Sequence, residues 1–262
     1  LALPPVNGCR LKKSTATPAD ALHPSVLVAD QVANSVAPQL VGLRDFQPCS
    51  AKSLRGEILD KGLRVNLESL LESAWGHGVA VIHLGHLPKA SKRFSGMALC
   101  VRDTHMVVLA SNNDRPPWLA FHLAHELGHL FLGHVDKGSR FAHGELEGAS
   151  NDKEEREANE FAIELLCGTK QHGFQPTYGL KARGLWRAAA TYGNAQNIDP
   201  GSVALVYGFT ANRMAVAQTA LKLMGQDTGA RKAIWDALAP HLDLSTNISE
   251  VTERHLRLLS SV

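Results

Sequence analysis

The stretch AFHLAHELGHLFLGH, residues 120–134, constrains this chain more than any other, because it holds four of the thirteen histidines. Within it, His125, Glu126 and His129 form the pattern H-E-x-x-H. Random placement of these residue types would give only roughly 0.03 such matches in a chain of this length. Apolar flanks, and the absence of proline from 118 to 134, predict a mostly buried helix that begins near the proline pair of NNDRPP.

On such a helix the three polar side chains face one way. Residues four apart lie about 40° apart in projection and about 6 Å apart along the axis, so His125 and His129 point in the same direction. Glu126 projects on the same side, and two imidazoles and a carboxylate therefore converge on one small volume. The alternative is a pair of core histidines satisfied by hydrogen bonds. It is disfavoured because burying two histidines and a glutamate on an apolar helix is costly without a purpose.

The composition is that of a globular protein large enough to bury a sizeable core, with 44% apolar and 20% charged residues. A net charge of +2 gives no electrostatic reason to expect binding to nucleic acid or to a membrane. The four cysteines contain no C-x-x-C pair, which argues against a disulfide framework or a thiolate zinc site and favours a reducing cytoplasm. The first residues do not resemble a signal peptide, because their charges follow the apolar residues. We therefore expect a cytoplasmic protein.

Hydrophobic periodicity predicts both helices and short strands along the chain. Helices are expected over 25–45 with a break at Pro38, over 53–75 with Asn66 as the cap of the second half, and over 153–167. Strands are expected at 79–84, 96–102 and 105–110, the last two joined by a turn at Asp103-Thr104. Residues 136–152 are expected to form a loop, and residues 1–24 an irregular lead.

These elements predict an α+β fold in which a small β-sheet packs on the H-E-x-x-H helix and on a second helix. Three parts follow from this organisation. They are an N-terminal extension over 1–50, a core over 51–180, and a helical C-terminal region over 181–262 with breaks near 194–200 and 225–229.

A catalytic zinc ion takes three protein ligands and keeps one open position, so a third ligand is needed. A further histidine at the spacing H-E-x-x-H-x-x-G-x-x-H would stand at position 135, where the chain has Val135. His134 is out of step by one residue, and on a continuing helix it would lie about 140° from His129 in projection. The sequence therefore favours a carboxylate from a later helix.

The segment NDKEEREANEFAIELL supplies that carboxylate. Glu155 and Asn159 are four residues apart and share one face of the expected helix. Glu154 and Glu157 are competing ligands, and Glu155 also fits a capping box that begins at Asp152. We take Glu155 as the candidate third ligand.

The stretch WLAFHLAHELGHLFLGHV followed by EEREANEFAIELL resembles the ImmA/IrrE family of zinc-dependent peptidases. In that family an H-E-x-x-H helix is coupled to a downstream E-x-x-A-N-x-F-A helix. The upstream stretch from GVAVIHL to HMVVLA is similar to the small sheet before the family's active helix, and the resemblance covers roughly residues 55–170. It implies a zincin-like metallopeptidase core.

The resemblance also implies roles for individual residues. His125, His129 and Glu155 would hold Zn²⁺, and Glu126 would act as the general base. Asn159 would orient a zinc-binding histidine, with a surface amide as the alternative. Candidates for stabilising the oxyanion are His122, His134, His143 and Tyr178, with a core role as the alternative for His122. Gly128 is expected to allow close approach of a neighbouring element.

As a function, the resemblance implies a zinc endopeptidase that makes limited cuts in a protein. A DNA-binding repressor or an antitoxin in a bacterial stress, mobile-element or phage-defence circuit is the expected target. The alternative is a zinc-containing regulatory module that acts by binding a partner through its helical C-terminal part. No helix-turn-helix is recognisable in the 262 residues, so direct nucleic-acid binding is not expected. No apolar run approaches the length needed to span a membrane, so membrane association is not expected either.

Overall fold

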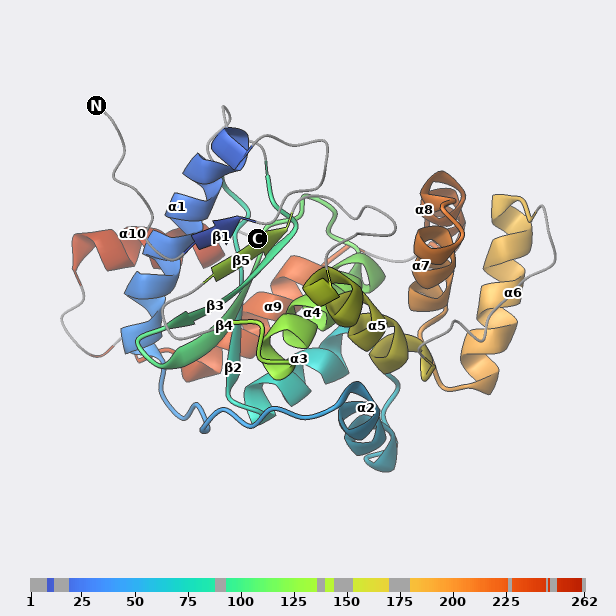
Figure 1. Ribbon diagram of the computed structural model, residues 1–262, viewed down its shortest axis with the longest axis horizontal. Helices are drawn as coiled ribbons and strands as arrows, with labels where there is room; N and C mark the ends of the chain where they lie inside the picture. The colour runs from blue at the N-terminus through green and yellow to red at the C-terminus, as the bar shows by residue number, and fades with distance from the viewer. Residues whose placement is uncertain are drawn as a thin grey trace.

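The structure, a computed structural model, describes residues 9–11, 19–87, 93–135, 140–143, 153–169, 180–225, 228–243, 245 and 249–260. In this part of the chain a mixed β-sheet lies among helices (Figure 1). Its strands are β1 (Cys9–Leu11), β2 (Val79–His83), β3 (Gly96–Val101), β4 (Thr104–Leu109) and β5 (Arg140–His143). The helices are α1 (Ala19–Val36), α2 (Ala51–Asp60), α3 (Leu67–Gly76), α4 (Pro116–Phe131), α5 (Lys153–Cys167), α6 (Ala182–Ala195), α7 (Pro200–Thr210), α8 (Met214–Leu223), α9 (Ala230–Leu238) and α10 (Glu250–Ser260), with short 3-10 turns at Ala37–Gln39 and Ala239–His241.

The central strands β2, β3 and β4 are covered on both faces. Along β4, Val107 and Leu109 join a core that includes residues of α3 and α4. Met106 and Val108 join a second core with residues of α1 and α10 on the other face. Burial on both faces explains why these strands read as continuous apolar runs in the sequence. The expected α+β fold, with its sheet packed on the H-E-x-x-H helix, is confirmed.

The expected strands and their hairpin are present, and the turn lies one residue earlier than expected. Strands β3 and β4 pair in antiparallel fashion, with Val101 opposite Thr104. The two turn residues are Arg102 and Asp103, with φ of 49° and 66° respectively. Two consecutive positive φ angles match the right-handed twist of the flanking strands, which is why Thr104 belongs to β4 and not to the turn.

Two other expectations need correction, because short strands lie inside segments expected to be irregular. Within 136–152, β5 pairs antiparallel with β3, and within 1–24, β1 pairs parallel with β5. The sheet order among the described strands is therefore β1-β5-β3-β4-β2. Segments of three or four residues show too little hydrophobic periodicity to be recognised as strands from the sequence. Their place in the sheet depends on hydrogen bonds to the neighbouring strand. The first helix also begins earlier than expected, at Ala19.

The helix boundaries around position 66 agree with the sequence. The side chain of Asn66 accepts a hydrogen bond from the backbone N–H of Ser69 at 3.0 Å, which caps α3. The Ser69 hydroxyl in turn accepts from the Asn66 backbone N–H at 3.1 Å, completing a capping box. This local exchange separates α2 from α3 within the expected helical segment 53–75.

The C-terminal region is helical, as expected, with breaks at the two expected places and two more at 211–213 and 239–249. Helices α6, α7 and α8 form a small cluster of their own, separated from the sheet by α4 and α5, and α7 packs on both of these helices (Figure 1). By contrast, α9 packs on β2 and α10 packs on α1. Whether 181–262 acts as a separate part stays a prediction.

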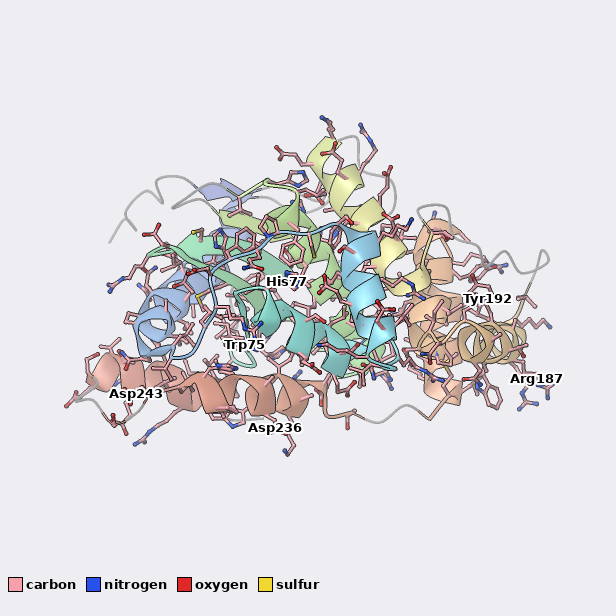
Figure 2. The ribbon with its side chains drawn as sticks, turned by 90° about the horizontal axis from the view of Figure 1, so that it is seen from below. Trp75, His77, Arg187, Tyr192, Asp236 and Asp243 are labelled. Carbon is pink, nitrogen blue, oxygen red and sulfur yellow. The ribbon has the colours of Figure 1, made fainter. Side chains whose placement is uncertain are left out.

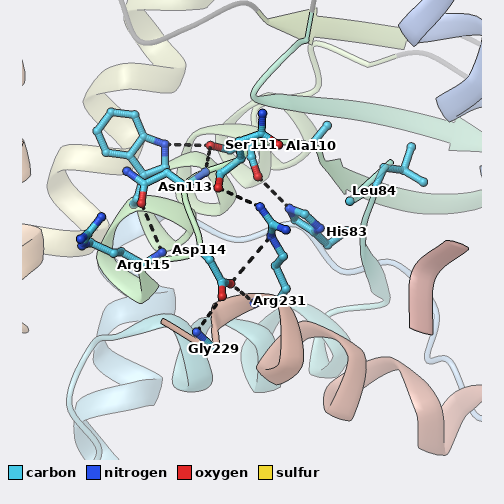
Figure 3. Close-up of polar contacts among 12 residues, drawn as sticks. His83, Leu84, Ala110, Ser111, Asn113, Asp114, Arg115, Gly229 and Arg231 are labelled. Atoms are coloured by element: carbon cyan, nitrogen blue, oxygen red, sulfur yellow. Dashed lines mark hydrogen bonds and ion pairs between the residues drawn. The ribbon is translucent and has the colours of Figure 1, made fainter. Parts of the chain in front are cut away.

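Helix α9 is held at its N-terminus by the loop that precedes α4 (Figure 3). The Asp114 carboxylate accepts hydrogen bonds from the backbone N–H groups of Gly229 at 2.9 Å and Arg231 at 2.8 Å. These N–H groups lack partners within the helix, so the carboxylate both satisfies them and complements the helix dipole. The C-terminal part of the chain is thereby fixed next to the start of the H-E-x-x-H helix. Among the described helices, none combines the length and the apolarity needed to cross a bilayer.

Candidate metal centre

Helix α4 is the buried helix expected from the sequence. It begins with Pro116 and Pro117 in its first turn and ends at Phe131, and every residue from Pro117 to Phe131 is buried. The indole of Trp118 donates to the Ser111 hydroxyl at 3.0 Å, which attaches the first turn to the preceding loop. The polar residues of the motif are therefore held on an element with no solvated face.

Three side chains converge on one point between α4 and α5. His125 Nε2 and His129 Nε2 lie 3.2 Å apart. Glu155 presents one carboxylate oxygen to each imidazole, at 3.6 Å from His125 Nε2 and 3.6 Å from His129 Nε2. The three form a group that could hold a metal ion, and both histidines are buried. Of the candidate carboxylates, the structure places that of Glu155 in this group.

The donor atoms fit a small divalent cation. Tetrahedral zinc with Zn–N and Zn–O bonds of about 2.0–2.2 Å requires its donors to lie about 3.3–3.5 Å apart. The donor separations of 3.2, 3.6 and 3.6 Å surround that value. Two imidazoles and one carboxylate are also the donor set of several catalytic zinc sites, in which a fourth position remains open.

Gly128 explains how α5 comes close enough to supply its carboxylate. A Cβ atom at Gly128 would lie 3.1 Å from the Cα and 3.1 Å from the carbonyl oxygen of Ala158, and 3.2 Å from Cβ of Phe161. These are backbone and near-backbone atoms of α5, which cannot move independently of that helix. The expected close approach at Gly128 is therefore confirmed, and the element that approaches is the ligand helix itself.

Glu126 lies beside this group without belonging to it. Its side chain is 1% exposed and packs against the first residue of β3, Gly96. A Cβ atom at Gly96 would lie 2.7 Å from Cγ and 2.9 Å from Cδ of Glu126, so a larger residue there would displace the Glu126 side chain. Gly96 was not among the residues predicted from the sequence. The signal was present, because a glycine inside a strand pattern often marks a close approach by another group.

His134 has a different position from the one expected, because α4 does not continue to it. The helix stops at Phe131, and Gly133 adopts φ +75°, which turns the chain back. His134 Nδ1 consequently lies 3.0 Å from His129 Nδ1, and His134 Nε2 lies 3.2 Å from Glu157 Oε2. The condition of a continuing helix is therefore not met, and His134 lies outside the group of three donors, in agreement with its rejection as the third ligand.

This chain of contacts favours one tautomer of His129. With Nε2–H of His134 donating to Glu157, Nδ1 of His134 accepts the hydrogen bond from Nδ1–H of His129. His129 then presents the lone pair of its Nε2 atom to the site, which is the form that binds a cation. Glu157, which the sequence offers as a competing ligand, instead contacts His134, and His134 contacts the ligand His129.

The other candidates take less defined positions. Asn159 is half-buried on α5, and its orienting role stays a prediction. His122 is buried, with its ring 5.6 Å from that of Trp118, in agreement with a core position. The backbone of His143 lies opposite Gly96 in the sheet, close in register to the residue that touches Glu126. Tyr178, and the Asp152 of the expected capping box, lie outside the described residues.

The site consists of a buried helix that carries two histidines and an adjacent glutamate, and of a glutamate from the next helix. This arrangement is typical of metal-dependent peptidases. The sequence model of the IrrE N-terminal-like domain, peptidase family M78, matches residues 75–171. This match spans the end of α3, strands β2 to β5 and both ligand-bearing helices. Residues 75–171 are thus similar to the IrrE N-terminal-like domain, which supports the resemblance to the ImmA/IrrE family. No curated protein matches the chain.

Proposed function

We propose that this protein is a zinc-dependent endopeptidase that makes limited cuts in a protein target. The observation that carries the proposal is the position of Glu126. Its buried carboxylate stands on the same helix as His125 and His129, in contact with Gly96 and outside the group of three donors. A site that only held a metal ion would not require a fourth buried ionisable group there.

Zinc is the cation that the donor set supports best, because borderline-soft imidazole nitrogens and one carboxylate suit Zn²⁺ better than Mg²⁺ or Ca²⁺. A bound zinc ion would supply Lewis acidity and lower the pKa of a coordinated water toward neutrality. The remaining chemistry belongs to the side chains of this chain.

Glu126 accepts a proton from the attacking water and later gives it to the leaving amine of the cleaved peptide bond. Gly96 and the surrounding core hold the carboxylate in one place, so that the proton acceptor is oriented before substrate binds. His134 and Glu157 keep the Nε2 lone pair of His129 directed into the site.

For the target, we propose a DNA-binding repressor or an antitoxin in a bacterial stress, mobile-element or phage-defence circuit, with the cut made in the cytoplasm. The similarity of residues 75–171 to the IrrE N-terminal-like domain supports a regulatory peptidase. The small net charge of +2 supports recognition of a protein and not of nucleic acid.

Glu126→Gln tests the proposal, because glutamine keeps the size of the side chain but cannot accept the proton. The parent and the variant are incubated with an extract of the native cell, and newly formed protein N-termini are quantified by mass spectrometry. We expect the parent to produce a small set of cuts and the variant to lose about 10²–10⁴ in rate. The variant should still bind metal and should retain the target as a stable complex.

Glu160→Gln is the matched control, because Glu160 is an exposed carboxylate on α5 outside the donor group. Cleavage at the parental rate by Glu126→Gln would place the base elsewhere. Loss of metal or of folding in that variant would make Glu126 a structural residue. It would then favour the alternative of a metal-containing module that acts by binding its partner.

A further inference from the structure

A second group of metal-binding residue types lies where the segment before α2, the helix α2 itself and the end of α3 meet. Cys49 precedes α2, Glu57 lies within α2, and His77 is the C-terminal cap of α3. Each offers one ligand atom, and the three atoms lie within 4.8 Å of one another. His77 stands at the end of α3, beside the chain that leads into α2 (Figure 2).

The His77 ring is fixed in one orientation by backbone contacts. Its Nδ1–H donates to the carbonyl oxygen of Gln47 at 2.7 Å. The backbone N–H of Gln47 donates to the carbonyl oxygen of His77 at 3.0 Å, so two hydrogen bonds hold the two residues together. This leaves Nε2 directed toward Glu57 and Cys49. A histidine that binds a metal typically donates its other ring N–H to a backbone carbonyl in the same way.

We propose that Cys49 Sγ, Glu57 Oε2 and His77 Nε2 bind one zinc ion, at a site distinct from the one between α4 and α5. His77 Nε2 lies 4.0 Å from Cys49 Sγ and 2.9 Å from Glu57 Oε2. Tetrahedral zinc would place its nitrogen and sulfur donors about 3.6 Å apart and its nitrogen and oxygen donors about 3.4 Å apart. The nitrogen–sulfur distance would have to fall by about 0.4 Å and the nitrogen–oxygen distance to rise by about 0.5 Å, and the sulfur and oxygen atoms lie within 4.8 Å of each other.

The mixture of donors selects the metal. A thiolate, an imidazole and a carboxylate together suit Zn²⁺ and not Mg²⁺ or Ca²⁺, which require oxygen ligands. Glu57 is half-exposed, with 48% of its side chain accessible, so a cation can enter from solvent. The bound ion would join α2 to the end of α3 and stabilise the start of the core, a structural role separate from peptide cleavage.

The same cluster does not suit a nucleophilic cysteine. Burial, and then the charge of Glu57, raise the pKa of the Cys49 thiol to about 11, whereas a nucleophile needs a lowered value. Glu57 also contacts the same His77 nitrogen that faces the sulfur, so it cannot orient that histidine from behind. In the metal-free protein Cys49 is therefore a thiol, and zinc binding would release its proton.

The competing arrangement is a metal-free ion pair between doubly protonated His77 and Glu57. Cobalt(II) distinguishes the two, because a cobalt–thiolate bond gives an intense near-ultraviolet charge-transfer band that nitrogen and oxygen ligands do not give. The donors between α4 and α5 include no sulfur, so the band reports the proposed site alone. Metal-free full-length protein is titrated with Co²⁺, and zinc content is measured separately after saturation and removal of excess metal.

We expect the thiolate band in the parent, its loss in Cys49→Ser, and its retention in Cys167→Ala, where a buried cysteine of α5 is replaced. We expect two zinc equivalents in the parent and one in Cys49→Ser, and one in His129→Ala, which removes the other centre. Equal melting temperatures of metal-free parent and Cys49→Ser show that folding is unchanged. Absence of the band in the parent, or its persistence in Cys49→Ser, would overturn the proposal, and neither result would bear on Glu126.

Discussion

Gly96 leaves the space that the Glu126 side chain occupies, since a Cβ atom on Gly96 would lie 2.7 Å from Cγ of Glu126. The first residue of a strand thereby determines where the proposed base stands. The contact ties the position of the carboxylate to the register of β3, in which Gly96 pairs with Leu109 on one side and His143 on the other.

Gly96→Ala is therefore expected to displace the Glu126 carboxylate and leave the metal donors in place. Cleavage of the protein target should fall by about 10²-fold, because a displaced base loses most of the advantage of positioning, while bound zinc should remain near the parental content. Gly56→Ala in α2 is the matched control, because a Cβ atom there meets nothing within 4 Å. Parental cleavage rates in both variants would show that this contact has no catalytic importance.

The third ligand can be identified by comparing two adjacent carboxylates. Glu155→Ala should weaken zinc binding far more than Glu154→Ala, because only Glu155 presents oxygens to both histidines, at 3.6 Å each. Competition with a fluorescent zinc chelator gives the dissociation constants of both variants. Equal losses, or a larger loss in Glu154→Ala, would contradict the assignment of Glu155.

His134 and Glu157 should affect metal binding without contacting the metal. Glu157→Gln and His134→Ala remove the support of the His129 tautomer, and a loss of about 10–100-fold in zinc affinity is expected for each. Because both act through one chain of contacts, the double variant should be little worse than either single variant. Additive losses in the zinc dissociation constants would show that the two side chains act independently.

His83 should make the stability of the protein fall at acidic pH. It lies at the end of β2, where its Nε2–H donates to the Ser111 carbonyl at 3.0 Å (Figure 3). Burial lowers its pKa from 6.5 to about 4, with Arg231 and Arg93 adding to the shift and the Ser111 hydrogen bond and Asp114 opposing it. Below pH 6.5 the unfolded chain therefore binds a proton that the folded protein does not bind. The free energy of unfolding falls as the pH drops toward 4.

The lost stability from this one group should reach about 2 kcal/mol at pH 5, relative to pH 7.5. His83→Gln keeps a donor for Ser111 but does not titrate, so urea unfolding of metal-free parent and variant at both pH values isolates the effect. The stability difference between the two proteins should change by that amount in favour of the variant at pH 5. A difference independent of pH would mean that folding does not lower the pKa of His83.

Much of the candidate centre could be predicted from the sequence, because it depends on contacts within one helix. The positions of His125, Glu126 and His129 follow from a rise and rotation that every α-helix shares. The Asn66 cap and the β3–β4 hairpin likewise depend on residues a few positions apart. In each case the partner atoms are neighbours along the chain, so local geometry is sufficient to bring them together.

Only the tertiary structure decided the remaining relationships. Three contacts depend on where chain segments turn and pack against one another. They are the contact of Gly96 with Glu126, that of His134 with His129 after α4 ends, and that of Cys49 with His77. The absence of a C-x-x-C pair in the sequence gives no information on Cys49 and His77, because they lie on segments that are far apart along the chain. Such distances are set by the end of a helix, the register of a strand and the packing of a core. These are properties of the whole fold, because closing each loop costs entropy that only burial elsewhere in the molecule can offset.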